Sequence, residues 1–165
     1  MAAESRTFEN DDAIACQTHS QRGTETDNTH DPTTCDPATC NVVLVVDDSP
    51  TILLFVKRAL EQAGIHTCAA RTASEAIALI SKTKPALILL DMSIEGDDEE
   101  PLIQRLSRDG IFQRTRVILY SNRVESVLQA AATRYGASGY LRKSGNAREV
   151  IAAVSTELAR LADTK

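Results

Sequence analysis

The chain has 165 residues, of which 42% are hydrophobic and 25% charged, and its formal net charge at pH 7 is −5. These values are typical of one soluble globular domain with some residues to spare. No apolar stretch is long enough to cross a membrane, and the N-terminus lacks the basic start and apolar core of a secretory signal, so we expect a cytoplasmic protein. Aromatic residues make up only 4% and basic residues are scattered, which argues against a nucleic-acid-binding surface.

Residues 1–40 are predicted to be an acidic, disordered N-terminal tail. They hold eight acidic and two basic residues, a net charge of −6, whereas residues 41–165 hold 15 acidic and 16 basic residues, a net charge of +1. With few apolar residues, the tail cannot bury enough surface to offset the entropy lost on ordering.

Metal-ligating residue types recur in this tail, at Cys16, His19, His30, Cys35 and Cys40. Such residues can form a zinc site, but their spacing matches no familiar zinc finger, and two Asp-Pro pairs interrupt it. We favour a linker with incidental thiols and leave metal binding open. Disulfides are not expected in a reducing cytoplasm.

The first apolar run after the tail, 42–46, predicts a buried strand that ends in Asp47-Asp48. Ser49-Pro50 suits a helix start, with serine as the N-cap, and apolar residues at helical spacing continue to Gly64, which suits the helix end. A short strand is predicted at 66–70.

A second helix is predicted to open at Thr72 in a capping-box pattern, followed by a strand that ends at Asp91. An acidic run, 95–100, leads through Pro101 into a third helix. The remaining predicted elements are a strand at 116–120, a helix at about 124–135, a strand at 139–141 and a helix from 146. Five repeats of strand and helix predict a parallel sheet with helices on both faces.

Chemically active residues follow four of these strands: Asp47, Asp48, Asp91, Ser121 and Lys143. Parallel strands end at one edge of a sheet, so these side chains can converge there. Three carboxylates together repel unless a cation joins them, and hard oxygen ligands favour Mg²⁺. A lysine and a hydroxyl beside them suit a transferred phosphoryl group, with Asp91 as the carboxylate nucleophile.

Each residue also has a simpler interpretation. Asp47-Asp48 can complement the dipole of the following helix, Ser121 can be a turn residue, and Lys143 can be a solvated surface lysine. The occurrence of all of them at consecutive strand ends of one sheet favours a shared site.

At these residues the chain resembles a response-regulator receiver domain of two-component signalling, over about Val42 to Leu161. The motifs are the acid pair in VVLVVDDSP, the acceptor aspartate in LILLD, the hydroxyl in VILYS, and the aromatic residue and lysine in GYLRK. The resemblance implies a doubly wound, flavodoxin-like α/β fold with a five-stranded parallel sheet, and a receiver domain at 41–165.

The resemblance also implies that Asp91 is phosphorylated by a histidine kinase or phosphotransfer protein. Asp48 would then bind Mg²⁺ directly and Asp47 mainly through water, while Asp91 and the backbone carbonyl of Ser93 complete the protein ligands.

The remaining roles fall on three residues. Lys143 would pair with the phosphoryl group, Ser121 would hydrogen-bond to it, and Tyr140 matches the aromatic residue that switches inward. The switch would alter the face formed by the fourth helix, fifth strand and fifth helix of the repeat, where partners usually dock.

The chain departs from the family pattern at Glu95 and Ser144, where proline is usual, and at Asn122, where a small residue is usual. No chemical group is lost, but loop geometry and phosphoryl lifetime are affected. The acidic run 95–100 either favours the dipole of the following helix or disfavours anionic small phosphodonors.

We expect a stand-alone receiver that signals by protein binding or phosphorelay, catalysing at most its own phosphorylation and dephosphorylation. The alternative is a pseudo-receiver that binds partners independently of phosphorylation. A Mg²⁺-dependent phosphohydrolase is disfavoured because Met92-Ser93 offers no second catalytic acid, and no glycine-rich nucleotide loop with lysine is present.

Overall fold

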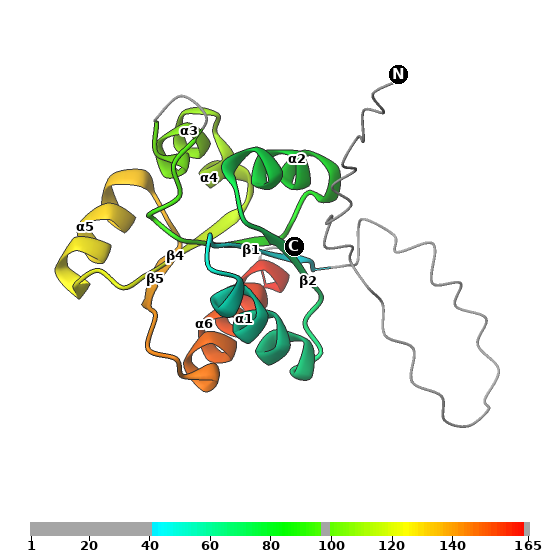
Figure 1. The fold of residues 1–165 in the computed structure, drawn as a ribbon. Coiled ribbons are helices and arrows are strands. Elements are labelled where there is room, and N and C mark those ends of the chain that lie inside the picture. The colour runs from blue at the N-terminus through cyan, green and yellow to red at the C-terminus, as the bar shows by residue number, and fades with distance from the viewer. Residues whose placement is uncertain (1–40, 97–99, 164–165) are drawn as a thin grey trace, which may run out of the picture.

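The computed structural model describes residues 41–96 and 100–163. Its centre is a parallel sheet of five strands in the order β2-β1-β3-β4-β5, which confirms the predicted doubly wound architecture (Figure 1). The strands are β1 (Val43–Val46), β2 (Thr67–Ala70), β3 (Leu87–Leu90), β4 (Arg116–Ser121) and β5 (Gly139–Arg142).

Helices cover both faces of the sheet, with α1 and α6 on one side and α2, α3 and α5 on the other (Figure 1). The helices are α1 (Pro50–Gln62), α2 (Ala73–Thr83), α3 (Leu102–Arg108), α4 (Ile111–Arg114), α5 (Glu125–Tyr135) and α6 (Ala147–Ala162). None of the described helices is long and apolar enough to cross a membrane.

The core is divided into two clusters because successive side chains of a strand point to opposite faces. On β1, Leu44 and Val46 pack with α2, α3 and α5, whereas Val43 and Val45 pack with α1 and α6. All four side chains are at most 1% exposed, which explains why the strand sequence is continuously apolar rather than alternating.

The predicted helix starts of α1 and α2 are confirmed. The Ser49 hydroxyl accepts a hydrogen bond from the Ile52 amide, and the Thr72 hydroxyl accepts one from the Glu75 amide. Gly64 follows the C-cap of α1 with a φ of 77°, a left-handed conformation that glycine adopts without steric cost.

The sequence interpretation missed the short helix α4, because its four residues carry no usable apolar period. It also ended β4 and β5 one residue too early, since Ser121 and Arg142 pair with each other in the sheet. The predicted disordered tail, its candidate metal ligands, and Asp97, Asp98 and Glu99 of the acidic run lie outside the described residues.

Candidate functional site

The carboxyl edge of the sheet holds the predicted site residues in place through backbone hydrogen bonds. The Asp91 amide donates to the Val46 carbonyl at 2.9 Å, which puts Asp91 beside the end of β1. The Lys143 amide donates to the Ser121 carbonyl at 3.0 Å, which ties the residue after β5 to the end of β4. The strand ends therefore converge as the sequence predicted.

Strand alternation then decides which side chains meet. Asp47 continues the row of Val43 and Val45, which faces α1 and α6, and Asp91 continues the corresponding row of β3. Lys143 stands two residues after Leu141, which packs against the same cluster. All three polar side chains therefore lie on the α1–α6 side of the sheet edge.

Lys143 joins the two aspartates. Its Nζ lies 2.7 Å from Oδ2 of Asp47 and 2.8 Å from Oδ2 of Asp91. The side chains of Asp47, Asp91 and Lys143 are 0%, 4% and 8% exposed, so this charged group is almost completely removed from water. The simpler interpretation of Lys143 as a solvated surface lysine is wrong.

The second oxygen of each aspartate accepts a hydrogen bond from a backbone amide two residues ahead. Oδ1 of Asp47 accepts from the Ser49 amide at 3.0 Å, and Oδ1 of Asp91 accepts from the Ser93 amide at 3.1 Å. Each buried carboxylate is therefore oriented by its own following turn on one side and by Lys143 on the other.

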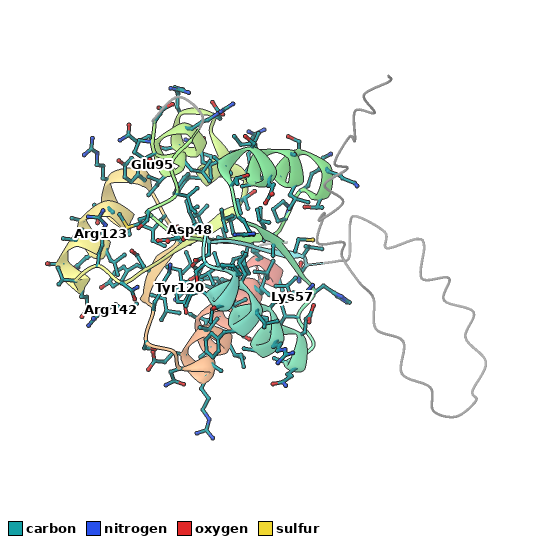
Figure 2. The ribbon with its side chains drawn as sticks, in the orientation of Figure 1. Asp48, Lys57, Glu95, Tyr120, Arg123 and Arg142 are labelled. Carbon is teal, nitrogen blue, oxygen red and sulfur yellow. The ribbon has the colours of Figure 1, made fainter. Side chains whose placement is uncertain are left out.

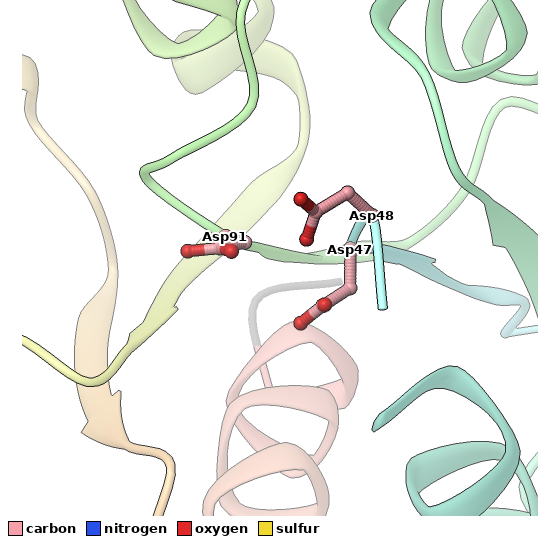
Figure 3. A group of neighbouring side chains, drawn as sticks. All are labelled: Asp47, Asp48 and Asp91. Carbon is pink, nitrogen blue, oxygen red and sulfur yellow. The ribbon is translucent and has the colours of Figure 1, made fainter. Parts of the chain in front are cut away.

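Asp48 completes a group of three carboxylates. Ligand atoms of Asp47, Asp48 and Asp91 all lie within 4.8 Å of one another, and Asp48 is exposed to solvent. Figure 3 shows the Asp47 side chain directed toward α6 and that of Asp48 directed to the other side of the strand end. A set of carboxylate oxygens with one solvated member fits Mg²⁺, which takes few protein carboxylates and retains water.

Burial and pairing shift the pKa values at this site. Burial raises the pKa of Asp47 above its usual range, although the contact with the Lys143 ammonium and the hydrogen bond from the Ser49 amide partly offset this effect. Burial lowers the pKa of Lys143, but its contacts with the Asp47 and Asp91 carboxylates outweigh that effect, so the pKa is raised. Lys143 therefore stays charged at neutral pH.

An open pocket of about 330 Å³ adjoins the carboxylates. Its lining consists of Asp91, Ser93, Ser121, Asn122, Arg123 and Lys143. An anion entering the pocket therefore meets one acidic residue, two basic residues, two serines and an asparagine. Ser121 is 2% exposed, so its side chain forms part of the pocket wall rather than an exposed turn.

Tyr140, the predicted switch residue, lies on the opposite face of the sheet from Lys143. Its half-buried side chain packs against the cluster under α5, and its hydroxyl donates to Oε1 of Glu125 at 3.3 Å. Tyr140 does not line the pocket. Its link to the pocket is β4, because Tyr140 pairs with Leu119, and Ser121, which lines the pocket, follows two residues later on that strand.

The loop after Lys143 is held by side chains where receivers usually have proline. The Ser144 hydroxyl donates to Oε2 of Glu149 at 2.6 Å, and the Asn146 amide side chain donates to Oε1 of the same carboxylate at 3.0 Å. The Asn146 backbone amide donates in turn to the Ser144 hydroxyl at 3.2 Å. This network ties the loop to the first turn of α6.

Two residues at the site escaped the sequence interpretation. Arg123 lines the pocket, and the ring of Tyr120 lies under Lys143, with Nζ 5.7 Å from the ring centroid. The signal for Arg123 was its position two residues after the hydroxyl of Ser121. Tyr120 could have been noticed as the only residue with a polar group within the apolar run Val117 to Tyr120.

The sequence is related to those of several bacterial proteins. The phosphate regulon transcriptional regulatory protein PhoB of Pseudomonas aeruginosa is 32% identical over 118 residues, which are 72% of this chain and 52% of PhoB. Protein PilH of the same species is 26% identical over 117 residues, which are 71% of this chain and 97% of PilH. The chain thus spans about half the length of PhoB and nearly all of PilH.

Solved receiver structures share the fold. The CheY-like receiver domain protein from Methanospirillum hungatei superposes with a TM-score of 0.67 at 22% identity, covering 77% of this chain and 100% of that protein. The receiver domain of the Francisella response regulator 1452 gives a TM-score of 0.65 at 29% identity, covering 73% of this chain and 98% of the domain.

The family model of the response regulator receiver domain matches residues 43–155, which include the three carboxylates, the buried hydroxyl and the lysine. Receiver domains are phosphoacceptors rather than true enzymes, and they generally partner with histidine kinases. With this match, the sheet order and the acidic pocket, the chain belongs to the response regulator receiver family of two-component signalling.

Proposed function

We propose that the protein is a phosphorylation-controlled signalling protein that accepts a phosphoryl group on Asp91 from a histidine kinase or a histidine phosphotransfer protein. The observation that carries this proposal is the position of Asp91, whose carboxylate lines the pocket while Oδ2 lies 2.8 Å from Lys143. A carboxylate in this position is open to a phosphodonor on one side and held by a cation on the other.

Asp47, Asp48 and Asp91, with the backbone carbonyl of Ser93, would hold Mg²⁺ at the sheet edge. Support comes from the shared 4.8 Å neighbourhood of the carboxylate oxygens and from the pocket position of Ser93. Bound Mg²⁺ would neutralise charge on the phosphoryl oxygens during transfer. Asp48 is the exposed member of the set, which suits a direct metal ligand that remains in contact with water.

Lys143 and Ser121 would bind the transferred phosphoryl group. Lys143 already lies against the acceptor, and its raised pKa keeps it cationic, so it can pair with an incoming anion without a change in protonation. The Ser121 side chain lines the same pocket and would donate a hydrogen bond to a phosphoryl oxygen.

A partner would detect phosphorylation at the face formed by α5, β5 and α6. These elements are the predicted fourth helix, fifth strand and fifth helix, and the helix labels are one higher because the short helix α4 was not predicted. Tyr140 on β5 is the proposed switch residue, and inward movement would break its hydrogen bond to Glu125 at the start of α5. Val124 at the N-cap of α5 and Val127 within α5 are 61% and 40% exposed, and exposed apolar side chains suit a protein partner. We place the protein in the cytoplasm, with its kinase.

Phosphorylation is tested with purified protein, Mg²⁺ and a small phosphodonor or a cognate kinase. We expect an acid-stable, hydroxylamine-sensitive phosphate, as an aspartyl phosphate requires, and its loss in Asp91→Ala. Asp109→Ala is the matched control because Asp109 is an exposed aspartate beyond the end of α3.

Absence of labelling with several donors and kinases would favour the second candidate, a pseudo-receiver that binds its partner independently of phosphorylation. The features that favour this candidate are Asn122 at the pocket wall and Ser144 after the lysine, both departures from the family pattern. Co-purification with beryllofluoride-treated protein and with Asp91→Ala separates the two functions, because a scaffold captures the same partner in both states.

A further inference from the structure

Lys143 contacts aspartates that follow strands distant from its own in the sheet. It follows the edge strand β5, whereas Asp91 follows β3, and β4 lies between these strands. Neighbouring strands are about 4.8 Å apart, so the side chains of Lys143 and Asp91 together bridge roughly 10 Å of sheet. Because its Nζ does reach Asp91, the side chain lies along the sheet rather than standing away from it.

The residue of β4 beneath this path is Tyr120. Within β4, Ile118 and Tyr120 both pack on the α1–α6 side, the side on which Lys143 meets the aspartates. Figure 2 labels Tyr120 on that side of the sheet. Tyr120 also pairs in register with Leu141, two residues before Lys143 on the same face. The Lys143 ammonium lies over the tyrosine ring, with Nζ 5.7 Å from its centroid.

Burial makes this contact stronger than a similar contact at the surface. Tyr120 is 1% exposed and the Lys143 side chain 8%. Attraction between an ammonium and an aromatic face is greater where water is excluded, since water no longer competes for the cation.

The hydroxyl of Tyr120 forms no hydrogen bond with Lys143. It is buried and has no hydrogen-bond partner among the described residues, although buried tyrosines usually find one. The part of the side chain that meets Lys143 is therefore the ring.

We propose that Tyr120 is a positioning residue for Lys143, whose ring face fixes the path of the lysine across β4 and holds its ammonium against Asp47 and Asp91. The inference rests on the proposed role of Lys143 in phosphoryl transfer. Lysine has a flexible four-carbon stem, and two carboxylates on one side restrain only its end. The flat ring lies under the ammonium and adds a restraint from the side of β4, so the ammonium is already in place when a phosphodonor enters the pocket.

The contact is tested first without any phosphodonor. Aromatic rings shift the NMR signals of protons above their faces, so the Lys143 ε-methylene protons should resonate upfield of the other lysines. We expect the shift to persist in Tyr120→Phe and to disappear in Tyr120→Leu. Ile118→Val is the matched control, because Ile118 is buried on the same strand and face but is not the residue under the lysine.

The second arm measures the rate of Asp91 phosphorylation at saturating Mg²⁺. Loss of the ring in Tyr120→Leu should lower the maximal rate by about three- to tenfold with little change in the half-saturating phosphodonor concentration, whereas Tyr120→Phe should keep the wild-type rate. Folding is checked by circular dichroism, and Tyr120→Met replaces the leucine variant if that variant is unfolded.

A Lys143 shift or a phosphorylation rate that is unchanged in Tyr120→Leu overturns the proposal. So does a phenylalanine variant as impaired as the leucine variant, since the hydroxyl would then be the active part. If the wild-type protein accepts no phosphoryl group, the proposed function fails, and the NMR arm alone decides whether Tyr120 positions Lys143.

Discussion

Lys143 Nζ lies 2.7 Å from Oδ2 of Asp47, although two strands, β3 and β4, separate β1 from β5 in the sheet. The same ammonium contacts Asp91, so one lysine neutralises part of a group of three carboxylates. These carboxylate oxygens are also the proposed Mg²⁺ ligands. Lys143 and the metal therefore act on the same side chains, which leads to opposite effects on metal binding and on phosphoryl transfer.

Replacing Lys143 with alanine should strengthen Mg²⁺ binding, by roughly fivefold, because a competing positive charge is removed from the ligands. The same variant should lose at least about tenfold in phosphorylation rate, since the phosphoryl group loses its counter-charge. Titration calorimetry measures the first effect and phosphodonor labelling the second. Lys57→Ala is the control, as Lys57 forms a surface pair with Glu61. Weaker Mg²⁺ binding in Lys143→Ala would contradict the shared-ligand arrangement.

Addition of Mg²⁺ should stabilise the folded protein, because the metal binds a carboxylate group that is assembled only by folding. At ten times its dissociation constant the expected gain in free energy of unfolding is about 1.4 kcal/mol. Urea unfolding with Mg²⁺ and with a chelator measures it. Asp48→Ala should remove most of the gain while Asp109→Ala keeps it. An equal gain in both variants would place the metal elsewhere.

Tyr120→Phe should raise the free energy of unfolding by about 1 kcal/mol at pH 7, because it removes a buried hydroxyl that has no hydrogen-bond partner in the described part of the chain. Urea unfolding at pH 7 tests this gain. A large loss of stability would show that the hydroxyl has a partner in solution.

The gain should also change with pH. Burial raises the pKa of Tyr120 above its usual value of 10.0, so the folded state binds this proton more tightly than the unfolded state. The corresponding stability is fully present below pH 10 and is lost as the pH rises through the raised pKa. The advantage of the phenylalanine variant over wild type should therefore grow above pH 10. A difference that stays constant across this range would contradict the shift.

Glu149→Ala should loosen the loop after Lys143, because Glu149 accepts hydrogen bonds from Ser144 and Asn146. These groups are exposed, so the loss of stability should be small, about 0.5 kcal/mol. The sharper measurement is amide hydrogen exchange, which should become faster at Asn146. Ser155→Ala, an exposed change further along α6, is the control. Unchanged exchange at Asn146 would show that the backbone holds the loop without the carboxylate.

Much of the fold could be predicted from local patterns. Continuous apolar runs mark β1 and β3 because both faces of these strands are buried, and Ser49 and Thr72 mark helix starts because their hydroxyls accept backbone hydrogen bonds. The short helix α4 could not be predicted in this way, because four residues are too few for a helical period.

The candidate site likewise has a part that local patterns predict and a part that they do not. Apolar runs that end in polar residues are enough to place Asp47, Asp91 and Lys143 at the carboxyl ends of strands, and therefore at one sheet edge, because parallel strands share their direction. The folded chain adds that β4 lies between β5 and β3, so that the Lys143 ammonium lies over the ring of Tyr120 where it meets the aspartates. Strand order depends on packing between distant segments, and no local pattern of residues encodes which neighbour a buried side chain will meet.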